Sequence, residues 1–189
     1  SSIAISQNTT IDSLKRIMPF AKTDTARVNV YNHLANEYKE INPDSTLYFS
    51  KIALKLSKKQ SYQYGIANSY INTGNAFIVL GKYDEAKNSF ITANKIYQKE
   101  LDDDSDNVDF QKGLARTYAS LGVIYSQESN YYVALENYQK ALNIYQKIGL
   151  KTGISKALNN IGVVYKSQGN NEKALQYFIK ALKIQIEIG

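Results

Sequence analysis

The chain contains no cysteine and a single histidine. Without cysteine there can be no disulfide framework, no thiolate zinc site and no cysteine nucleophile. His33 has neither a cysteine nor a second histidine with which to share a metal ion, so we predict no metal site and no cofactor. No run of about 18 apolar residues occurs, and we expect no direct membrane insertion by this segment.

Motifs typical of catalysis and of nucleic-acid binding are also missing. The sequence has no Walker loop, dinucleotide fingerprint or nucleophile elbow, so we predict that this chain is not an enzyme and that any catalytic domain lies outside it. The formal net charge of +6 is distributed as +4 over residues 1–60, −3 over 61–112 and +5 over 113–189. Because lysine and arginine form no cluster, we expect no nucleic-acid partner.

The ten glycines fall on only four positions of a repeating unit. Successive units are spaced by 48 and then 40 residues, which indicates a repeat array with one insertion. Such periods are typical of a solenoid, in which each unit buries its apolar faces against its neighbours. The four sets are Gly74, Gly122 and Gly162; Gly65, Gly113 and Gly153; Gly81 and Gly169; and Gly149 and Gly189.

Apolar residues recur three or four positions apart within each unit, which predicts two helices per unit. In the first unit, Asn42 and Pro43 predict the start of the second helix, as a capping residue followed by proline in the first turn. We predict nine helices and essentially no strand. They are 11–18 (stopped by Pro19), 25–40, 45–59, 65–80, a helix beginning at Tyr83, 114–128, 132–148, 154–168 and 172–188.

The small residues of the repeat predict close packing between helices. Glycine inside a helix costs about 1 kcal/mol relative to alanine, so we expect a neighbouring backbone to pass close to Gly74, Gly122 and Gly162. Aromatic residues beside them are expected to fill the core rather than to stack on a ligand. In the first unit Thr46 and Ser50 replace an alanine and an aromatic residue, and we expect looser packing there.

This pattern of small and aromatic residues resembles the tetratricopeptide repeat. The resemblance covers about residues 25–189, and the 40-residue spacing is similar to that of the longer-helix subclass in polarity adaptors and kinesin light chains. It implies an all-α solenoid of four helix-turn-helix repeats plus a short N-terminal helix, forming a right-handed superhelix with a concave groove. The clearest instances are Gly74, Phe77, Gly81, Ala86, Phe90 and Ala93, and Gly162, Tyr165, Gly169, Ala174, Phe178 and Ala181.

We therefore expect a tail at residues 1–9 and a single domain at 10–189. The repeats are placed at about 24–60, 61–101, 107–149 and 151–189, with an acidic insertion at 101–112. Asp102, Asp104 and Asp106 alternate as in a calcium loop, but Asn107 and Gly113 occupy the positions that require glycine and glutamate. We expect a solvated linker in which Asp106 or Asn107 caps the next helix.

The first helix of each unit is expected to line the concave groove and to bind an extended peptide or protein partner. Asparagine recurs at these positions and no acid does, and an amide can both donate to and accept from a peptide backbone. Arg116, Lys156 and Lys166 would add recognition of a carboxylate. Solvated polar residues on an unpacked face are the alternative. The predicted binding residues are Asn29, His33, Asn36, Asn68, Asn72, Asn75, Arg116, Ser120, Lys156, Asn159, Asn160 and Lys166.

Two wider roles are open. Residues 9–38 resemble the exported N-terminal regions of repeat-containing sensor histidine kinases and regulators in Bacteroidetes, which implies the sensor region of a larger signalling receptor. Ala4-Ile5-Ser6 fits the small-x-small rule for signal-peptide cleavage, which favours an exported, periplasmic location. The alternative is a free-standing, cytoplasmic adaptor or assembly scaffold. In either case a homodimer through the apolar C-terminal repeat would fit, since terminal repeats normally carry a polar outer face.

Overall fold

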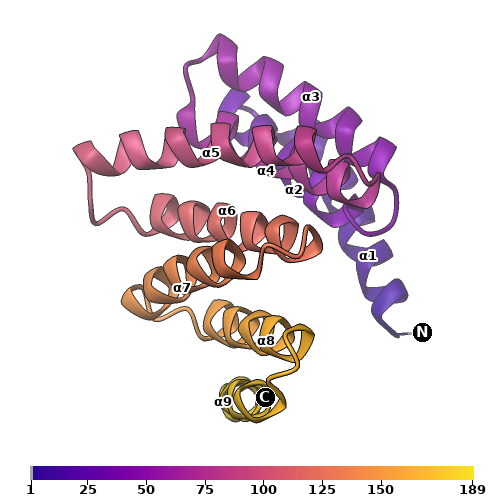
Figure 1. Cartoon of the computed structure of the whole chain (residues 1–189). Coiled ribbons are helices and arrows are strands. Elements are labelled where there is room, and N and C mark those ends of the chain that lie inside the picture. The colour runs from indigo at the N-terminus through magenta and orange to yellow at the C-terminus, as the bar shows by residue number, and fades with distance from the viewer. Residues whose placement is uncertain (1) are drawn as a thin grey trace. The chain divides into compact units, whose positions relative to one another are not determined.

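The computed structural model describes the backbone of residues 2–189 and the side chains from Thr9 onward. Residues 2–189 form helices and turns and no strand, which confirms the all-α prediction (Figure 1). None of these helices is both long and apolar enough to cross a lipid bilayer. The elements are α1 (Ser2–Ile17), a 3-10 turn (Met18–Phe20), α2 (Asp24–Tyr38), α3 (Pro43–Lys59), α4 (Gln63–Val79), α5 (Tyr83–Asp103), α6 (Val108–Gln127), α7 (Tyr131–Lys147), α8 (Lys151–Ser167) and α9 (Asn171–Ile188).

The N-terminal helix is longer than expected, because α1 begins at Ser2 rather than near Ile11. Pro19 lies in the 3-10 turn that follows it, where the predicted stop falls. The side chains of the cleavage motif at residues 4–6 lie outside those that the structure describes.

Asparagine side chains cap several helices where the sequence predicts that these helices begin. The Asn42 side chain accepts a hydrogen bond from the Ser45 amide at 2.9 Å, with Pro43 in the first turn of α3. Asn107 accepts from the Phe110 amide at 3.2 Å and begins α6. Each cap satisfies an amide that has no partner within its own helix. Most of the predicted insertion at 101–112 is helical, because α5 extends to Asp103 and α6 begins at Val108. Only residues 104–107 form a turn between them, and Asp106 in this turn lies 3.8 Å from the Lys147 ammonium.

The chain packs as two compact units, Ser1–Ile96 and Tyr97–Gly189, with the boundary inside α5. In the first unit α3 packs against both α2 and α4. In the second unit α6, α7, α8 and α9 pack in succession, as Figure 1 shows. The core of the second unit includes the buried residues Tyr138, Leu158 and Ile161.

Within a helix pair, the glycine near the middle of the first helix faces an aromatic ring of the second helix. A Cβ atom added at Gly74 would lie 2.7 Å from the ring of Phe90. The same distance separates a Cβ at Gly122 from Tyr138, and one at Gly162 from Phe178. Carbon atoms in contact lie about 3.5–4.0 Å apart, so these positions have no room for a side chain. The glycines are thus explained by a ring, and not by the close backbone that we expected.

The other glycine set lies between consecutive pairs. A Cβ at Gly65 would lie 2.5 Å from Ser57 Oγ, and one at Gly153 would lie 2.5 Å from the ring of Tyr145. Gly113 stands in the same relation to the ring of Tyr97. The first helix of a repeat therefore begins directly against the last turns of the preceding helix. The glycine is contacted from one repeat position of the preceding helix, which holds Ser57 in α3, Tyr97 in α5 and Tyr145 in α7. In α9 the same position holds Gln185.

Candidate functional site

The twelve predicted binding residues all lie on the first helix of a pair. They divide between the two units. Asn29, His33 and Asn36 are on α2; Asn68, Asn72 and Asn75 are on α4; Arg116 and Ser120 are on α6; and Lys156, Asn159, Asn160 and Lys166 are on α8.

Asn72 is buried between α2 and α4 and does not face solvent as expected. It is 2% exposed, and its amide donates to the main-chain oxygen of Asn32 at 2.9 Å and to Asn32 Oδ1 at 3.2 Å. The Asn32 amide in turn donates to the oxygen of Gly65, and Ser69 Oγ donates to Asn32 Oδ1. Buried polar groups normally carry such partners. Asn72 therefore holds two helices together, and is not exposed to a peptide.

Two further asparagines of the first unit are engaged within the chain. Asn68 is 9% exposed and donates to the Tyr64 oxygen at 3.0 Å. Asn29 accepts from the Tyr62 hydroxyl at 3.2 Å. His33 is exposed, and Asn75 is half-buried. Asn36 is also half-buried, and its amide lies 3.4 Å from Glu37 Oε1.

In the second unit the structure brings three predicted residues into one groove. Lys156, Asn159 and Asn160 lie along one side of a cavity of about 430 Å³ between α8 and α9. Lys156 and Asn159 are exposed, and Asn160 is half-buried. The rest of the lining comes from Ser155 on α8 and from Phe178, Ala181, Leu182 and Gln185 on α9.

The groove has a polar wall and a mostly apolar floor. Ser155 is 5% exposed, and its hydroxyl makes contacts of 3.1 Å with the Ala181 oxygen and with Gln185 Oε1. The contact with Oε1 turns the carboxamide oxygen of Gln185 toward Ser155. No acid lines the groove, and Lys156 is its one cation. The lining can therefore exchange hydrogen bonds with a peptide backbone and bind a carboxylate.

Asn72 and Asn160 occupy the same position of the repeat, but Asn72 is buried and Asn160 is half-buried. Asn72 meets the side chain of Asn32 on the preceding first helix. The residue that corresponds to Asn32 in front of Asn160 is Ala119, which has no side-chain acceptor. Asn160 is half-buried and lines the groove.

The remaining predicted residues of the second unit do not line the groove. Arg116 on α6 is half-buried, and it lies close enough to Tyr145 to act on that hydroxyl. Burial raises the pKa of Tyr145, and the positive charge of Arg116 partly offsets this rise. Ser120 is half-buried on α6, and Lys166 is exposed in the last turn of α8.

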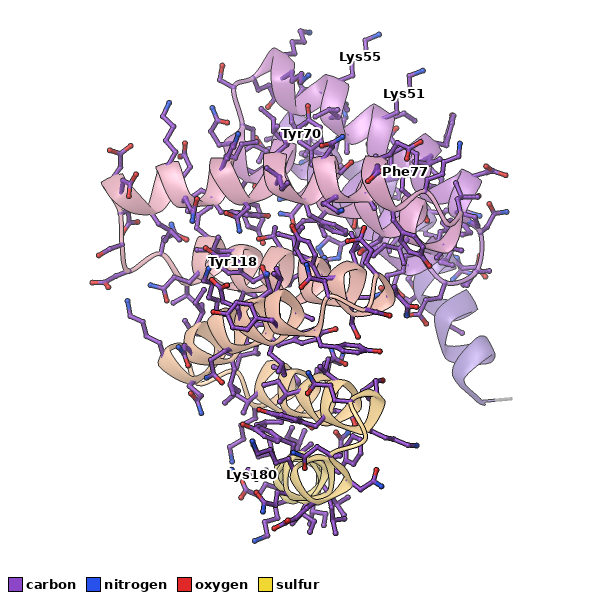
Figure 2. All side chains as sticks on the ribbon, viewed as in Figure 1. Lys51, Lys55, Tyr70, Phe77, Tyr118 and Lys180 are labelled. Carbon is purple, nitrogen blue, oxygen red and sulfur yellow. The ribbon has the colours of Figure 1, made fainter. Side chains whose placement is uncertain are left out.

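Two lysines of α9 lie over tyrosine rings. Lys180, labelled in Figure 2, has its ammonium 5.1 Å from the centre of the Tyr177 ring. Lys173 lies 5.2 Å from the centre of Tyr165, whose ring stacks on Tyr177 at 5.5 Å. A cation over an aromatic face is weakly stabilising at such distances. Neither lysine lines the groove, so the charge of the groove comes from Lys156.

The sequence analysis missed Asn32 and Gln185. Asn32 is adjacent in sequence to one of the predicted binding residues, and its structural role comes from its hydrogen bonds with Asn72. Gln185 lies on a second helix, whereas only first helices were considered. The available signal was its repeat position, since Ser57 and Tyr145 at the same position contact the next helix.

Paired helices that stack in succession through glycine–aromatic contacts define this protein as a helical-repeat protein. Two family models described as tetratricopeptide repeat match the sequence, one over residues 67–100 and the other over residues 113–187. The chain is therefore built of tetratricopeptide repeats over these residues, which together make up more than half of its length. No curated protein matches the sequence significantly.

Several crystal structures share the fold. BtubC (BKLC) from P. vanneervenii is 21% identical with a TM-score of 0.70, and the match covers 97% of this chain and 74% of that one. Aspartyl phosphate phosphatase F from Bacillus subtilis is 15% identical with a TM-score of 0.74, covering 93% and 44%. A Rap protein complexed with competence and sporulation factor is 17% identical with a TM-score of 0.63, covering 96% and 58%. This chain spans about half of the length of the latter two.

Proposed function

We propose that this protein is a non-catalytic interaction module that binds an extended segment of a protein partner over the groove between α8 and α9. The observation that carries the proposal is the joint placement of Lys156, Asn159 and Asn160 on one wall of this groove. Asn159 and Asn160 would pair with backbone amides and carbonyls, and Lys156 would bind a carboxylate. Ala181 and Leu182 would accept an apolar side chain.

The fold supports this proposal. A protein of the same fold is described in complex with competence and sporulation factor, which is an instance of ligand binding by this architecture.

The test begins with selection of peptides from a random displayed library against the purified chain. For the peptide that binds best, we expect Asn160→Ala and Lys156→Ala each to weaken binding by about tenfold, which corresponds to about 1.4 kcal/mol. Asn88→Ala and Lys95→Ala are matched controls, because both residues are exposed on α5 outside the groove. Equal affinities for the groove variants and the controls would refute the proposal.

We further propose that the module is the exported interaction region of a larger signalling receptor, with a free-standing adaptor as the alternative. The support is the resemblance of residues 9–38 to such regions and the small-x-small motif at residues 4–6. The complete reading frame of the parent gene discriminates between the two. A basic-apolar leader upstream with a membrane span and a signalling domain downstream would support the receptor, whereas a chain with neither would support the adaptor.

A further inference from the structure

Helix α9 carries a row of exposed apolar side chains. Leu175 is 60% exposed, Ile179 is 44%, Leu182 is 58% and Ile186 is 71%. Their spacing of four, three and four residues keeps them on one side of the helix. The row is distinct from the side that packs on α8, where Ala174 and Ala181 are buried. Leu182 is the one residue of the row that also borders the groove.

The second helices of the other pairs explain why two residues of this row, Leu175 and Leu182, are apolar. In α7 the counterparts of Leu175 and Leu182 are Leu135 and Leu142. Leu142 is 5% exposed and Leu135 packs against the same core, which α7 shares with the next helix. A further helix stacked on α9 in the same way would therefore cover Leu175 and Leu182.

The other half of the row has no such explanation. The counterparts of Ile179 and Ile186 are Lys51 and Lys58 in α3 and Gln139 and Gln146 in α7, and all four are exposed. Figure 2 shows the Lys51 side chain extending away from α3. In α5 these positions hold Ile91, which is half-buried, and Gln98, which is exposed. Isoleucine at both positions is thus found in α9 alone. A stacked helix would leave the position of Ile186 exposed and would cover that of Ile179 at most in part, as at Ile91.

The four residues match the seam of a two-stranded coiled coil. Ile179 and Ile186 are seven residues apart, as are Leu175 and Leu182, and the two sets alternate. Isoleucine at the first seam position and leucine at the second favours parallel dimers. In a parallel pair Lys183 of one copy would lie beside Phe178 of the other, so no like charges would face each other along the seam.

We propose that α9 is a self-association surface, and that two copies of this chain pair through parallel α9 helices along Leu175, Ile179, Leu182 and Ile186. A second copy covers all four residues, whereas a stacked repeat covers Leu175 and Leu182, Ile179 at most in part, and not Ile186. An isologous contact of this kind is also the commonest form of oligomer. The seam and the groove share Leu182, but the groove variants Lys156→Ala and Asn160→Ala leave the row unchanged and measure peptide binding separately.

The first test is the weight-average mass by sedimentation as a function of concentration. We expect the mass to rise from that of one chain toward that of two as the concentration approaches about 1 mM. Ile179→Lys with Ile186→Lys installs lysine as at Lys51 and Lys58, and we expect this variant to remain at the mass of one chain. Val108→Lys with Tyr132→Lys is the matched control, since both residues are exposed apolar positions outside α9.

A wild-type chain that keeps the mass of one chain throughout would overturn the proposal, as would a lysine variant that associates like the wild type. If the double variant loses helicity, Ile186→Lys alone gives the same test at the most exposed position of the row. Orientation is tested with Ile186→Cys in this cysteine-free chain. If the helices pack in parallel, the Ile186→Cys chain should form a disulfide-linked dimer faster than the Val108→Cys chain. Equal rates of dimer formation would contradict parallel packing.

Discussion

The side-chain amide of Asn72 in α4 donates a hydrogen bond to the main-chain oxygen of Asn32 in α2, at 2.9 Å. The same amide also donates to Asn32 Oδ1, which accepts a second hydrogen bond from Ser69 Oγ. This network joins the first helices of two consecutive repeats across a buried contact. Its residues therefore contribute to stability, although their repeat position suggests a role in binding.

Replacing Asn72 should destabilise the fold. We expect Asn72→Ala to lower the free energy of unfolding by about 1 kcal/mol, because the loss of two buried hydrogen bonds to Asn32 outweighs the removal of Asn72 Oδ1, which has no partner among the described residues. Denaturant titration followed by circular dichroism measures the change. Asn75→Ala, at a half-buried position one turn later, should stay within about 0.5 kcal/mol of the wild type. If both variants are equally stable, the network does not hold the helices together.

A side chain at Gly122 should collide with Tyr138. A Cβ there would lie 2.7 Å from the ring, and overpacking costs about 1–3 kcal/mol. The gain in helix propensity from glycine to alanine offsets about 1 kcal/mol of this. We therefore expect Gly122→Ala to lower the free energy of unfolding by up to about 2 kcal/mol in the same titration, while Ser120→Ala on the same helix has little effect. A stabilised Gly122→Ala chain would contradict the assigned role of the ring.

Ser50 should be a site of stabilisation. Its side chain is fully buried, and among the described residues its Oγ finds no hydrogen-bond partner. An unsatisfied buried hydroxyl costs about 1–3 kcal/mol, so we expect Ser50→Ala to raise the free energy of unfolding by about 1 kcal/mol. Thr46→Ala provides the contrast, because Thr46 donates to the Asn42 oxygen at 3.2 Å and its loss should destabilise. A lower melting temperature for Ser50→Ala would show that the hydroxyl is satisfied.

Buried tyrosines should make stability depend on alkaline pH. Burial raises the pKa of Tyr138 far above its usual value of 10.0. The folded chain therefore keeps the proton when the unfolded chain has released it, so the contribution is complete below pH 10 and falls as the pH rises above it. We expect Tyr138→Phe to lose less stability between pH 9 and pH 11.5 than the wild type. Tyr132→Phe, at a residue 79% exposed, should follow the wild type, and identical slopes for all three would contradict the assignment.

The helices could be predicted from the sequence because their signals are local. Asn42-Pro43 and Asn107 mark helix starts through a cap that each residue makes with its own helix. The small residues of the repeat were expected to pack closely, and Ala86 and Ala174 are both buried. Such features depend on residues close in sequence, and a single chain displays them directly.

The binding face was harder to predict, since exposure depends on the facing helix. Asn72 and Asn160 share one repeat position, but Asn72 bonds to Asn32, whereas the counterpart of Asn32 in the repeat before Asn160 is Ala119. Periodicity cannot report this difference, because it treats equivalent positions alike. The groove also needs Gln185, whose conformation is set by a contact with Ser155 thirty residues away.

The most direct test of the groove as the binding site is amide chemical-shift mapping by NMR during titration with a library-selected peptide. The account predicts that the largest shifts fall on Ser155, Lys156, Asn159, Asn160 and Gln185. It also predicts small shifts for Asn68 and Asn72, which are engaged inside the first unit. Shifts confined to other helices, with residues 155–160 unchanged, would contradict the central claim that this groove receives the partner.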